Sequence, residues 1–449
     1  MGKIFGTDGA RGVANKELSC ELAMNIGRCA ATVLTSHTHR KPKILIGKDT
    51  RISSDMLEAA LVAGLCSVGA DVMLIGVVPT PAVAYLVQEY EADAGIMISA
   101  SHNPVEFNGI KIFNENGYKL SDSIENEIEA MLEQGVPEKM LKTGGEIGSV
   151  IRVKTATKDY IDHIRSTVDV DLSGLTVAID CANGSASTTA QTLFTSMGAN
   201  CMIINDVPDG ININDNCGST HIEVLARYVV QNGCDVGVAF DGDADRCLAV
   251  DEHGVILDGD KLMAMFAHDM KKNGRLKNDT VVATVMSNLG FFKFCEKYDI
   301  HAESTKVGDR YVLENMLLGG HNLGGEQSGH IIFLDYMTTG DGQLSAAQLL
   351  CLLKKSGGNL SDLSEIMERY PQTLVNVTVA NDAKERLDGE ETIWNKIRAC
   401  EQQLQGDGRI LVRCSGTEPL IRVMVEGKDA ETIGAMAADI AETIKERLG

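Results

Sequence analysis

Two short segments of the sequence repeat one another, and this repeat limits the possible folds more than any other feature. Residues 69–79 are GADVMLIGVVP and residues 198–208 are GANCMIINDVP, so glycine, alanine, methionine, isoleucine, valine and proline recur at matching places. Each copy follows an apolar run, a polar loop and a helical pattern, which open at residues 43–51 and 176–184, and a fainter third copy opens at residues 280–290. The sequence therefore predicts three β-α-β units, with mixed or parallel sheets covered by helices and ligands at the strand ends.

The C-terminal part of the sequence follows a different pattern. Apolar runs at residues 375–379, 409–414 and 420–426 predict strands, one helix passes through Trp394, and another runs from about residue 430 to the end. We therefore expect three similar mixed-sheet α/β domains followed by a smaller α+β domain. The length of 449 residues suggests about three domains, but the change of pattern favours four. The predicted domains cover residues 1–150, 151–254, 255–368 and 369–449.

Composition excludes several classes of partner. The formal charge of −22 argues against nucleic acid and anionic membranes, because phosphate backbones demand concentrated lysine and arginine. The apolar stretches are interrupted well before the roughly 20 residues of a membrane span, and the first residues lack the apolar core of a signal peptide, so we expect a cytoplasmic protein. The 12 cysteines contain no C-x-x-C pair, which favours reduced thiols over disulfides or a zinc site.

Basic residues nevertheless lie inside nearly every glycine-rich loop. They are Arg11, Lys111, Arg246, Lys306, Arg310, Arg413 and Arg422. In an acidic chain, this local bias predicts a positively charged cleft for a small anionic substrate.

The most informative loop is ASHNPV, which contains Ser101 and His102. An apolar run at residues 94–98 predicts a buried strand before it, Asn103-Pro104 breaks that strand, and Gly109 allows a second bend. A serine in such a turn often only hydrogen-bonds the backbone. Ser101 is also a candidate nucleophile, and three further loops favour that interpretation.

The second loop is DGDADR, which places Asp241, Asp243 and Asp245 directly after an apolar run. Three carboxylates this close repel one another unless a cation neutralises them, and oxygen ligands favour magnesium. A solvated acidic turn is the plainer alternative. A calcium-binding EF-hand loop, with Glu252 at its twelfth position, is excluded because Arg246 replaces the sixth-position glycine and the flanks are typical of strands.

The third loop is GGEQSGH. If this segment is extended, Glu326 and Ser328 face the same side and can bind adjacent sugar hydroxyls. A structural glycine turn explains the same residues equally well. His330 is either a hydrogen-bonding side chain or an acid or base.

The fourth loop is RCSGTEPLIR, which is typical of an anion-binding site. Arginine matches two phosphate oxygens at once, hydroxyls add donors, and glycine lets backbone N–H groups converge. The residues concerned are Arg413, Ser415, Gly416, Thr417 and Arg422. An ordinary hairpin with charged strand ends is the alternative.

In this order, the loops resemble the α-D-phosphohexomutase superfamily across the whole chain. The shared motifs are FGTDGARG, ISASHNP, NGIK, NCGSTH, DGDADR, KVGDRYV, GGEQSGHII, TTGDG and SGTEPLIRVMVE. The resemblance implies four domains around a central cleft, the last with a TATA-binding-protein-like fold. In order, these domains would carry the phosphoserine, the metal, the sugar contacts and the phosphate contacts.

The resemblance also implies roles for single residues. Ser101 would carry a phosphoryl group and, with Asp241, Asp243 and Asp245, bind Mg²⁺. The implied catalytic residues are Ser101, His102, Lys111, Arg11 and Arg246. The implied substrate contacts are Glu326, Ser328, His330, Arg413, Ser415, Gly416, Thr417 and Arg422. Lys111 and His330 are both candidates for the general base.

Gln327 favours the branch that acts on glucosamine phosphates over phosphomannomutases and phosphoglucomutases, in which methionine is usual. The implied reaction interconverts glucosamine 6-phosphate and glucosamine 1-phosphate, which supplies the amino sugar of bacterial peptidoglycan. It passes through a sugar bisphosphate, which also serves as activator, and the resemblance makes a homodimer possible. A phosphomannomutase or phosphoglucomutase, a phosphoserine hydrolase and a non-catalytic divalent-cation-binding protein stay open as alternatives.

Overall fold

The computed structural model describes residues 4–6, 8–35, 40–380, 383–414 and 420–449. The chain divides into two compact units, each of which is described by itself. The first unit holds Met1–Met286 and Ile300–Ile366, and the second holds Ser287–Asp299 and Met367–Gly449. Within the described residues, no helix has the length and apolar character needed to cross a membrane.

The first unit begins with a seven-stranded sheet in the order β1-β2-β6-β5-β3-β4-β7. The strands are β1 (Phe5–Gly6), β2 (Gly9–Val13), β3 (Lys43–Lys48), β4 (Asp71–Val77), β5 (Ala94–Ile98), β6 (Phe107–Asn114) and β7 (Val150–Arg152). Strands β4 and β5 pair with β3 in parallel, whereas β6 is antiparallel to β5. The helices are α1 (Cys20–Leu34), α2 (Ile52–Ser67), α3 (Thr80–Glu89) and α4 (Asp122–Gln134).

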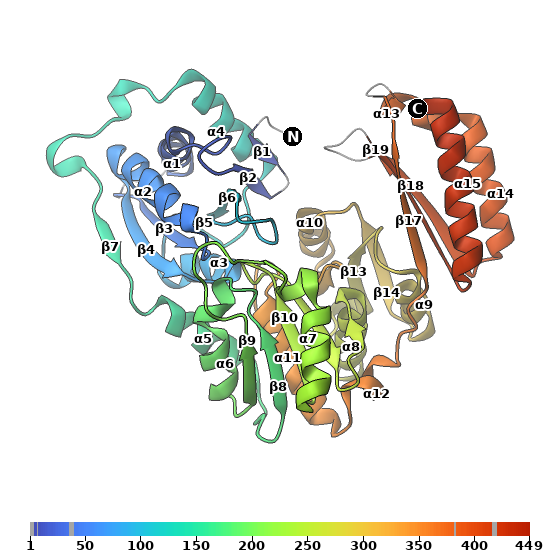
Figure 1. The fold of residues 1–449 in the computed structure, drawn as a ribbon. Coiled ribbons are helices and arrows are strands. Elements are labelled where there is room, and N and C mark those ends of the chain that lie inside the picture. Colours follow the sequence, from blue (N-terminus) through green and yellow to red (C-terminus); the bar gives the residue numbers. More distant parts are fainter. Residues whose placement is uncertain (1–3, 7, 36–39, 381–382, 415–419) are drawn as a thin grey trace. The chain divides into compact units, whose positions relative to one another are not determined.

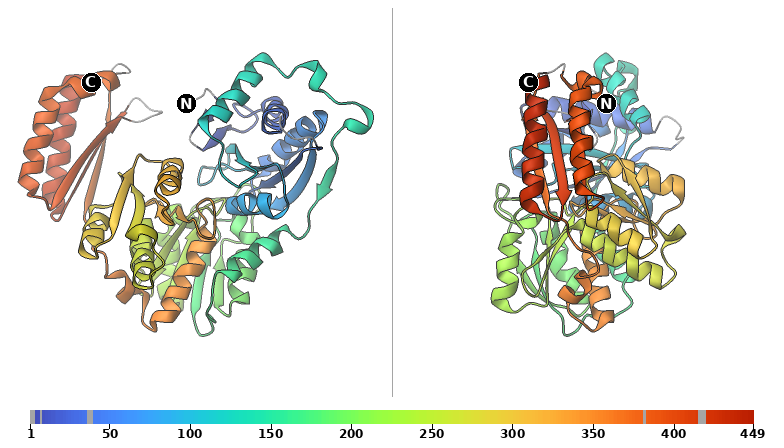
Figure 2. Two further views of the ribbon diagram at one scale, coloured as in Figure 1. Left: turned by 180° about the vertical axis from the view of Figure 1, so that it is seen from behind. Right: turned by 90° about the vertical axis from the view of Figure 1, so that its right-hand side faces the viewer.

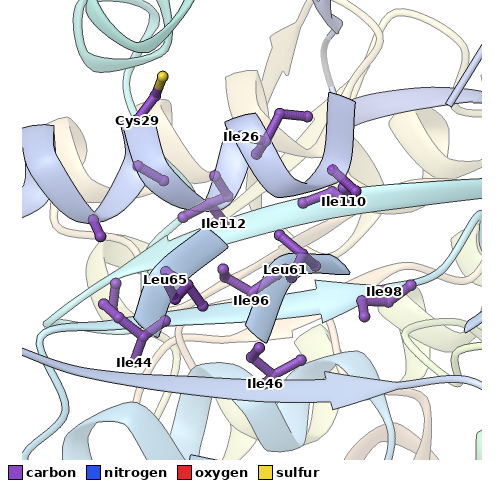
Figure 3. Close-up of a cluster of buried hydrophobic side chains, with 14 of the residues drawn as sticks. Ile26, Cys29, Ile44, Ile46, Leu61, Leu65, Ile96, Ile98, Ile110 and Ile112 are labelled. Atoms are coloured by element: carbon purple, nitrogen blue, oxygen red, sulfur yellow. The ribbon is translucent and has the colours of Figure 1, made fainter. Parts of the chain in front are cut away.

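Helices cover both faces of this sheet (Figure 1). On one face, Ile26 of α1 and Leu61 of α2 pack with Ile96 and Ile112, all at most 5% exposed (Figure 3). On the other face, α3 lies so close that a Cβ on Gly95 would be 2.4 Å from a methyl of Val87. Strand β5 is therefore buried on both faces, which explains its uninterrupted apolar sequence.

Two further sheets repeat this arrangement. The second has the order β12-β11-β10-β8-β9, and the third has the order β14-β13-β15-β16. Their strands are β8 (Thr176–Asp180), β9 (Asn200–Ile204), β10 (Val236–Phe240), β11 (Cys247–Asp251), β12 (Ile256–Leu257), β13 (Thr280–Thr284), β14 (His301–Thr305), β15 (Leu323–Gly325) and β16 (Ile331–Phe333). The helices of this part are α5 (Ala156–Ser166), α6 (Ala190–Ser196), α7 (Glu223–Asn232), α8 (Gly259–Lys272), α10 (Asp309–Gly319), α11 (Gly342–Ser356) and α12 (Leu360–Ser364).

In each sheet a central strand pairs in parallel with two neighbours, and one neighbour continues into an antiparallel hairpin. The three predicted β-α-β units are therefore confirmed. The strand predicted at residues 94–98 has those bounds in the structure, and the apolar run directly before Asp241 forms β10.

The second unit contains a smaller antiparallel sheet in the order β17-β19-β18. Its elements are β17 (Gln372–Thr378), α13 (Ala383–Arg386), α14 (Glu391–Leu404), β18 (Gly408–Cys414), β19 (Leu420–Gly427) and α15 (Ala430–Leu448). Helices α14 and α15 lie side by side on one face of the sheet (Figure 2), where Ile397 and Ile440 pack against Val423. The prediction of a smaller α+β region is confirmed.

Helix α9 (Leu289–Lys297) also belongs to the second unit, although it follows β13 in the chain. The buried carboxylate of Glu426 on β19 accepts hydrogen bonds from the Asn288 amide and from the Leu289 N–H, each at 3.1 Å. The exact borders of the four predicted domains stay predictions.

Candidate active site

The predicted catalytic loops occupy the same topological position in all three sheets of the first unit. Each loop is the turn of the antiparallel hairpin, between β5 and β6, between β10 and β11, and between β15 and β16. The three turns touch one another through their backbones. The Cys247 N–H donates to the Gly329 carbonyl at 3.0 Å, and a Cβ on Gly242 would lie 2.6 Å from the Ser101 carbonyl oxygen. The fold thus brings distant parts of the sequence into one site.

Ser101 lies at the centre of this site and is 1% exposed. Its hydroxyl donates a hydrogen bond to Asp241 Oδ2 at 2.6 Å and lies 3.3 Å from His102 Nδ1. The backbone of Ser101 has φ +53°, a left-handed conformation that residues other than glycine, asparagine and aspartate rarely adopt. The hydroxyl therefore reaches the acidic loop from an unfavourable backbone geometry, which the surrounding structure must stabilise.

Asp241, Asp243 and Asp245 form the acidic cluster, and one oxygen of each lies within 4.8 Å of the others. All three are buried, and the Oδ1 atoms of Asp243 and Asp245 have no hydrogen-bond partner among the described residues. Burial, together with the neighbouring Asp245 and Asp243 carboxylates, raises the pKa of Asp241 to about 8. Buried carboxylate oxygens without a partner are costly, so this donor set fits a hard cation such as Mg²⁺.

Lys111 is the principal cation beside the cluster. Its Nζ lies 2.7 Å from Asp243 Oδ2, 3.6 Å from Asp245 Oδ2 and 3.5 Å from Asp8 Oδ2. Burial alone lowers the pKa of Lys111, but these three carboxylates outweigh it and raise the pKa above its usual range. Lys111 is therefore a fixed positive charge, which disfavours it as a general base.

His102 lies beside Ser101, and Arg246 and Arg11 lie near His102. The Arg246 Nη1 lies 3.1 Å from His102 Nδ1, and burial together with the nearby Arg246 and Arg11 lowers the pKa of His102 to about 4. His102 is thus neutral at physiological pH. Arg11 Nη2 pairs with Asp8, and Arg246 Nε lies 3.9 Å from Asp245 Oδ1. The Nε atoms of both arginines are nevertheless buried without a hydrogen-bond partner among the described residues, so each retains a donor for an anion.

The predicted sugar loop is a tight turn rather than an extended segment. The Gly329 N–H donates to the Glu326 carbonyl, and the Glu326 N–H donates to the His330 carbonyl, both at 3.0 Å. The Glu326 carboxylate accepts the Gly308 N–H at 3.0 Å. The Ser328 Oγ is buried and has no hydrogen-bond partner in the described part of the chain. Because the turn is closed by backbone hydrogen bonds, the alternation of an extended strand does not apply to Glu326 and Ser328.

His330 is 3% exposed and held at both ring nitrogens. Its Nδ1 lies 3.6 Å from Asp245 Oδ2, and its Nε2 accepts the Gly340 N–H at 3.1 Å. Burial alone lowers the pKa of His330, but the carboxylates of Asp245 and Asp309 outweigh it and raise the pKa. The hydrogen bond from Gly340 fits the neutral form of the ring, with the proton on Nδ1 facing Asp245.

Arg413 and Arg422 of the predicted phosphate clamp lie in the second unit, directly opposite each other in the register of β18 and β19. Burial and the nearby Arg422 lower the pKa of Arg413. Like charges opposite each other destabilise a sheet, so the pair favours binding of an anion. Ser415, Gly416 and Thr417 lie outside the described residues.

Several residues of the site were not predicted from the sequence as site residues. The Thr80 hydroxyl donates to Asp243 Oδ2 at 2.5 Å. Lys119 forms hydrogen bonds at 2.5 Å to both Asp8 and Asp309. Asp8 and Asp309 lie in the motifs FGTDGARG and KVGDRYV, which could have drawn attention to them, whereas Lys119 has no such context.

Two residues considered from the sequence as possible ligand-binding groups, Arg310 and Glu252, have structural roles. Arg310, one of the loop cations, binds Asp122 at 2.5 Å and the Leu120 carbonyl at 2.7 Å, so its charge is already engaged. Glu252 accepts hydrogen bonds from the hydroxyl and the N–H of Ser361. Its carboxylate therefore does not join the acidic cluster, in agreement with the exclusion of an EF-hand loop.

Models of one enzyme family match nearly the whole chain. They are the domains of the phosphoglucomutase/phosphomannomutase family: α/β/α domain I at residues 2–138, domain II at 158–254, domain III at 258–370 and the C-terminal domain at 374–443. The chain belongs to the phosphoglucomutase/phosphomannomutase family. The resemblance to the phosphohexomutases is thereby confirmed, as is the prediction of an enzyme.

Individual relatives agree with this assignment. A protein of Acetivibrio thermocellus named phosphoglucosamine mutase is 56% identical over 449 residues, which cover 100% of both chains. A phosphoglucomutase/phosphomannomutase family protein of Burkholderia thailandensis has a crystal structure with a TM-score of 0.82 at 23% identity, covering 99% of this chain and 98% of the other. The N-acetylphosphoglucosamine mutase of Aspergillus fumigatus, solved with GlcNAc-6P and magnesium, gives a TM-score of 0.62 at 18% identity, covering 86% and 93%. The two solved structures show that the fold is shared.

Proposed function

We propose that this enzyme interconverts glucosamine 6-phosphate and glucosamine 1-phosphate through a phosphoserine at Ser101 and a bisphosphorylated sugar. The observation that carries the proposal is the Ser101 hydroxyl, which is buried and lies 2.6 Å from Asp241 in a cluster of three carboxylates. The choice of sugar is supported by the relative named phosphoglucosamine mutase, which matches along its full length.

Asp241, Asp243 and Asp245 would hold Mg²⁺ together with an oxygen on Ser101. When bound there, the ion would supply positive charge that offsets the oxygens of the transferring phosphoryl group. Phosphoryl transfer depends mainly on alignment and charge neutralisation, which a rigid buried cluster favours. The Aspergillus fumigatus structure with magnesium supports the choice of metal.

In the first half-reaction, a sugar hydroxyl attacks the phosphorus atom of phosphoserine 101. The bond between phosphorus and Ser101 Oγ breaks, a bond between phosphorus and the sugar oxygen forms, and the proton of the sugar hydroxyl passes through the general base to the leaving Ser101 Oγ. Lys111, with its raised pKa, keeps its own proton and offsets charge on the phosphoryl oxygens, as do the spare Nε–H donors of Arg11 and Arg246. His330 is the remaining candidate for the general base, and to take the proton on Nε2 it would have to give up its hydrogen bond from the Gly340 N–H.

In the second half-reaction, the bisphosphate has turned and its other phosphate returns to Ser101. Glu326 and Ser328 would hold the ring in both orientations, while Arg413 and Arg422 would hold the phosphate that does not react. A sugar bisphosphate can also restore a dephosphorylated Ser101, which explains its role as activator. A homodimer and a cytoplasmic location stay predictions.

The test compares turnover of glucosamine 6-phosphate, mannose 6-phosphate and glucose 6-phosphate, with glucose 1,6-bisphosphate as primer. Phosphorylation of Ser101 is quantified first by intact mass spectrometry. We expect the glucosamine phosphate to react fastest. Faster turnover of the mannose or glucose phosphate would refute the proposed substrate. Steady release of inorganic phosphate would instead indicate a hydrolase, and a protein that never carries phosphate would indicate a binding protein.

A further inference from the structure

A buried arginine lies directly beneath the Ser101 loop. Arg51 ends the segment KDTR, immediately before α2, and is 2% exposed. Its Nε donates to Asp49 Oδ2 at 2.9 Å, so the charge is paired inside the protein. Neither residue lies in one of the four loops predicted to carry chemistry.

The guanidinium group of Arg51 binds three carbonyl oxygens of one loop. Its Nη2 donates to the carbonyls of Ser101 and Asn103, both at 2.9 Å, and its Nη1 donates to the carbonyl of Pro104 at 3.0 Å. The Asn214 amide adds a second donor to the Ser101 carbonyl at 2.9 Å. A planar fork with several fixed donors can hold three carbonyls at once, whereas the single ammonium group of a lysine cannot.

The other side of Ser101 is linked to the same ion pair. The Ser101 N–H donates to Ser99 Oγ at 2.9 Å, and the Ser99 hydroxyl donates to Asp49 Oδ2 at 2.7 Å. The N–H and the carbonyl of Ser101 are therefore both anchored, through Ser99 and Arg51, on one buried carboxylate.

This anchoring explains how Ser101 keeps its left-handed backbone. A serine at φ +53° is held there only when the surrounding structure outweighs the steric cost. If the loop relaxed to a negative φ, the side chain would swing away from Asp241, where its hydroxyl now lies at 2.6 Å. The Arg51 side chain is fully buried, and its Nε, Nη1 and Nη2 atoms are all engaged by protein oxygens, so its effect on the reaction is indirect.

We propose that Arg51 and Asp49 are positioning residues that hold the phosphoryl-carrying serine in line for transfer. This inference rests on the proposed function, because it assumes that Ser101 carries the phosphoryl group. The pair sets the rate of transfer and leaves the affinity for the sugar phosphate unchanged.

The test uses Arg51→Lys in the full-length enzyme, loaded with phosphate from glucose 1,6-bisphosphate and mixed with glucosamine 6-phosphate in a single turnover. We expect the transfer rate and kcat to fall about 100-fold, the scale expected for a misplacement near 1 Å, while KM stays nearly constant. Unchanged kcat would overturn the proposal. A higher KM at unchanged kcat would also overturn it, because that result indicates substrate contact.

The matched control is Asp93→Asn, which alters another buried carboxylate of the same sheet. Asp93 accepts the Lys43 N–H at 2.8 Å and an Arg40 N–H at 2.9 Å, and it precedes β5, whereas Ser101 follows it. We expect this variant to lower the free energy of unfolding and to leave kcat unchanged. An equal loss of kcat in this control would show that Arg51→Lys acts through a general loss of stability, and it would overturn the proposal.

A second variant tests the role of Arg51 and Asp49 if Arg51→Lys does not fold. Ser99→Ala removes the acceptor of the Ser101 N–H and, with it, the hydrogen bond from Ser99 to Asp49 Oδ2. We expect kcat to fall at least about tenfold, because both links between the Ser101 N–H and the buried carboxylate are lost. Wild-type kinetics in Ser99→Ala would then refute the proposal. The wild-type enzyme separates this failure from that of the proposed function, since a wild type without transfer to any sugar phosphate would refute both.

Discussion

The contact between Thr80 and Asp243 predicts how strongly one hydroxyl supports the metal site. Thr80 is the first residue of α3, is fully buried, and donates to Asp243 Oδ2 at 2.5 Å. The backbone N–H of Thr80 binds the Asp243 carbonyl at 2.9 Å. Replacing Thr80 by valine therefore removes one hydrogen bond to a metal ligand and preserves the shape and backbone contacts of the residue.

The size of the effect follows from the charge of the acceptor. A hydrogen bond to a charged group contributes about 1.5–3 kcal/mol, which corresponds to roughly a 10- to 100-fold change in affinity. Lys111 also binds the same oxygen, at 2.7 Å, and compensates in part. We therefore expect Thr80→Val to weaken Mg²⁺ binding by about tenfold, near the lower limit for residues that orient metal ligands.

The assay is the Mg²⁺ dependence of turnover, with binding to the metal-free enzyme measured by calorimetry. Thr80→Ser keeps the hydroxyl and serves as the control, with an expected Mg²⁺ affinity close to that of the wild type. The free energy of unfolding of both variants is measured without metal to exclude a general loss of stability. Equal Mg²⁺ affinity in Thr80→Val and the wild type would falsify the reasoning, as would an equal loss in Thr80→Ser.

Three further variants test other parts of the site and fold. Ser101→Ala should abolish turnover and leave sugar-phosphate binding nearly intact. A residual rate above about one per cent of the wild-type rate would contradict the role of Ser101, because it corresponds to less than about 2.7 kcal/mol of lost transition-state stabilisation. Arg413→Lys should reduce kcat/KM in steady-state assays despite the conserved charge, because an ammonium group cannot bind two phosphate oxygens in one plane, and unchanged kinetics would remove Arg413 from the clamp. Burial lowers the pKa of His163 below 6.5, against the opposing effect of its hydrogen bond to the Tyr336 carbonyl at 2.9 Å. The unfolded state therefore binds more protons than the folded state, and the wild type loses stability as the pH falls below 6.5. In urea unfolding, the free energy of unfolding of His163→Gln should fall less between pH 7 and pH 5 than that of the wild type. Equal losses in the two proteins would contradict this.

The strands that carry the site could be predicted because their burial leaves a strong pattern. Strands β5 and β10 are buried at every position, and each is an apolar run that ends at a polar turn. The sequence also indicated which turns carry chemistry, because glycines, hydroxyls and carboxylates follow these runs at once. The geometry of the third turn was harder to predict. The sequence left an extended segment and a glycine turn equally open at Glu326, and only the backbone hydrogen bonds of the folded chain decide for the turn.

Contacts between distant segments left no pattern in the sequence. Lys119 pairs with Asp8 and Asp309, yet no periodicity links residues that lie this far apart in the chain. Arg310 had the same local context as the predicted phosphate-binding cations, but Asp122 and the Leu120 carbonyl already engage its charge. Which cation stays available for a ligand depends on which anion the fold places beside it.

The sequence by itself determined the three β-α-β units, the smaller C-terminal α+β region and the residue types at each turn, because period, burial and turn chemistry are local properties. Only the tertiary structure decided that Ser101 lies 2.6 Å from Asp241, that Thr80 and Lys111 share one oxygen of Asp243, and that Arg51 anchors the serine loop. The physical reason is that hydrogen bonds and ion pairs act over a few ångströms in space. The chain positions that make them are separated by many residues, and only the packed hairpins bring them together.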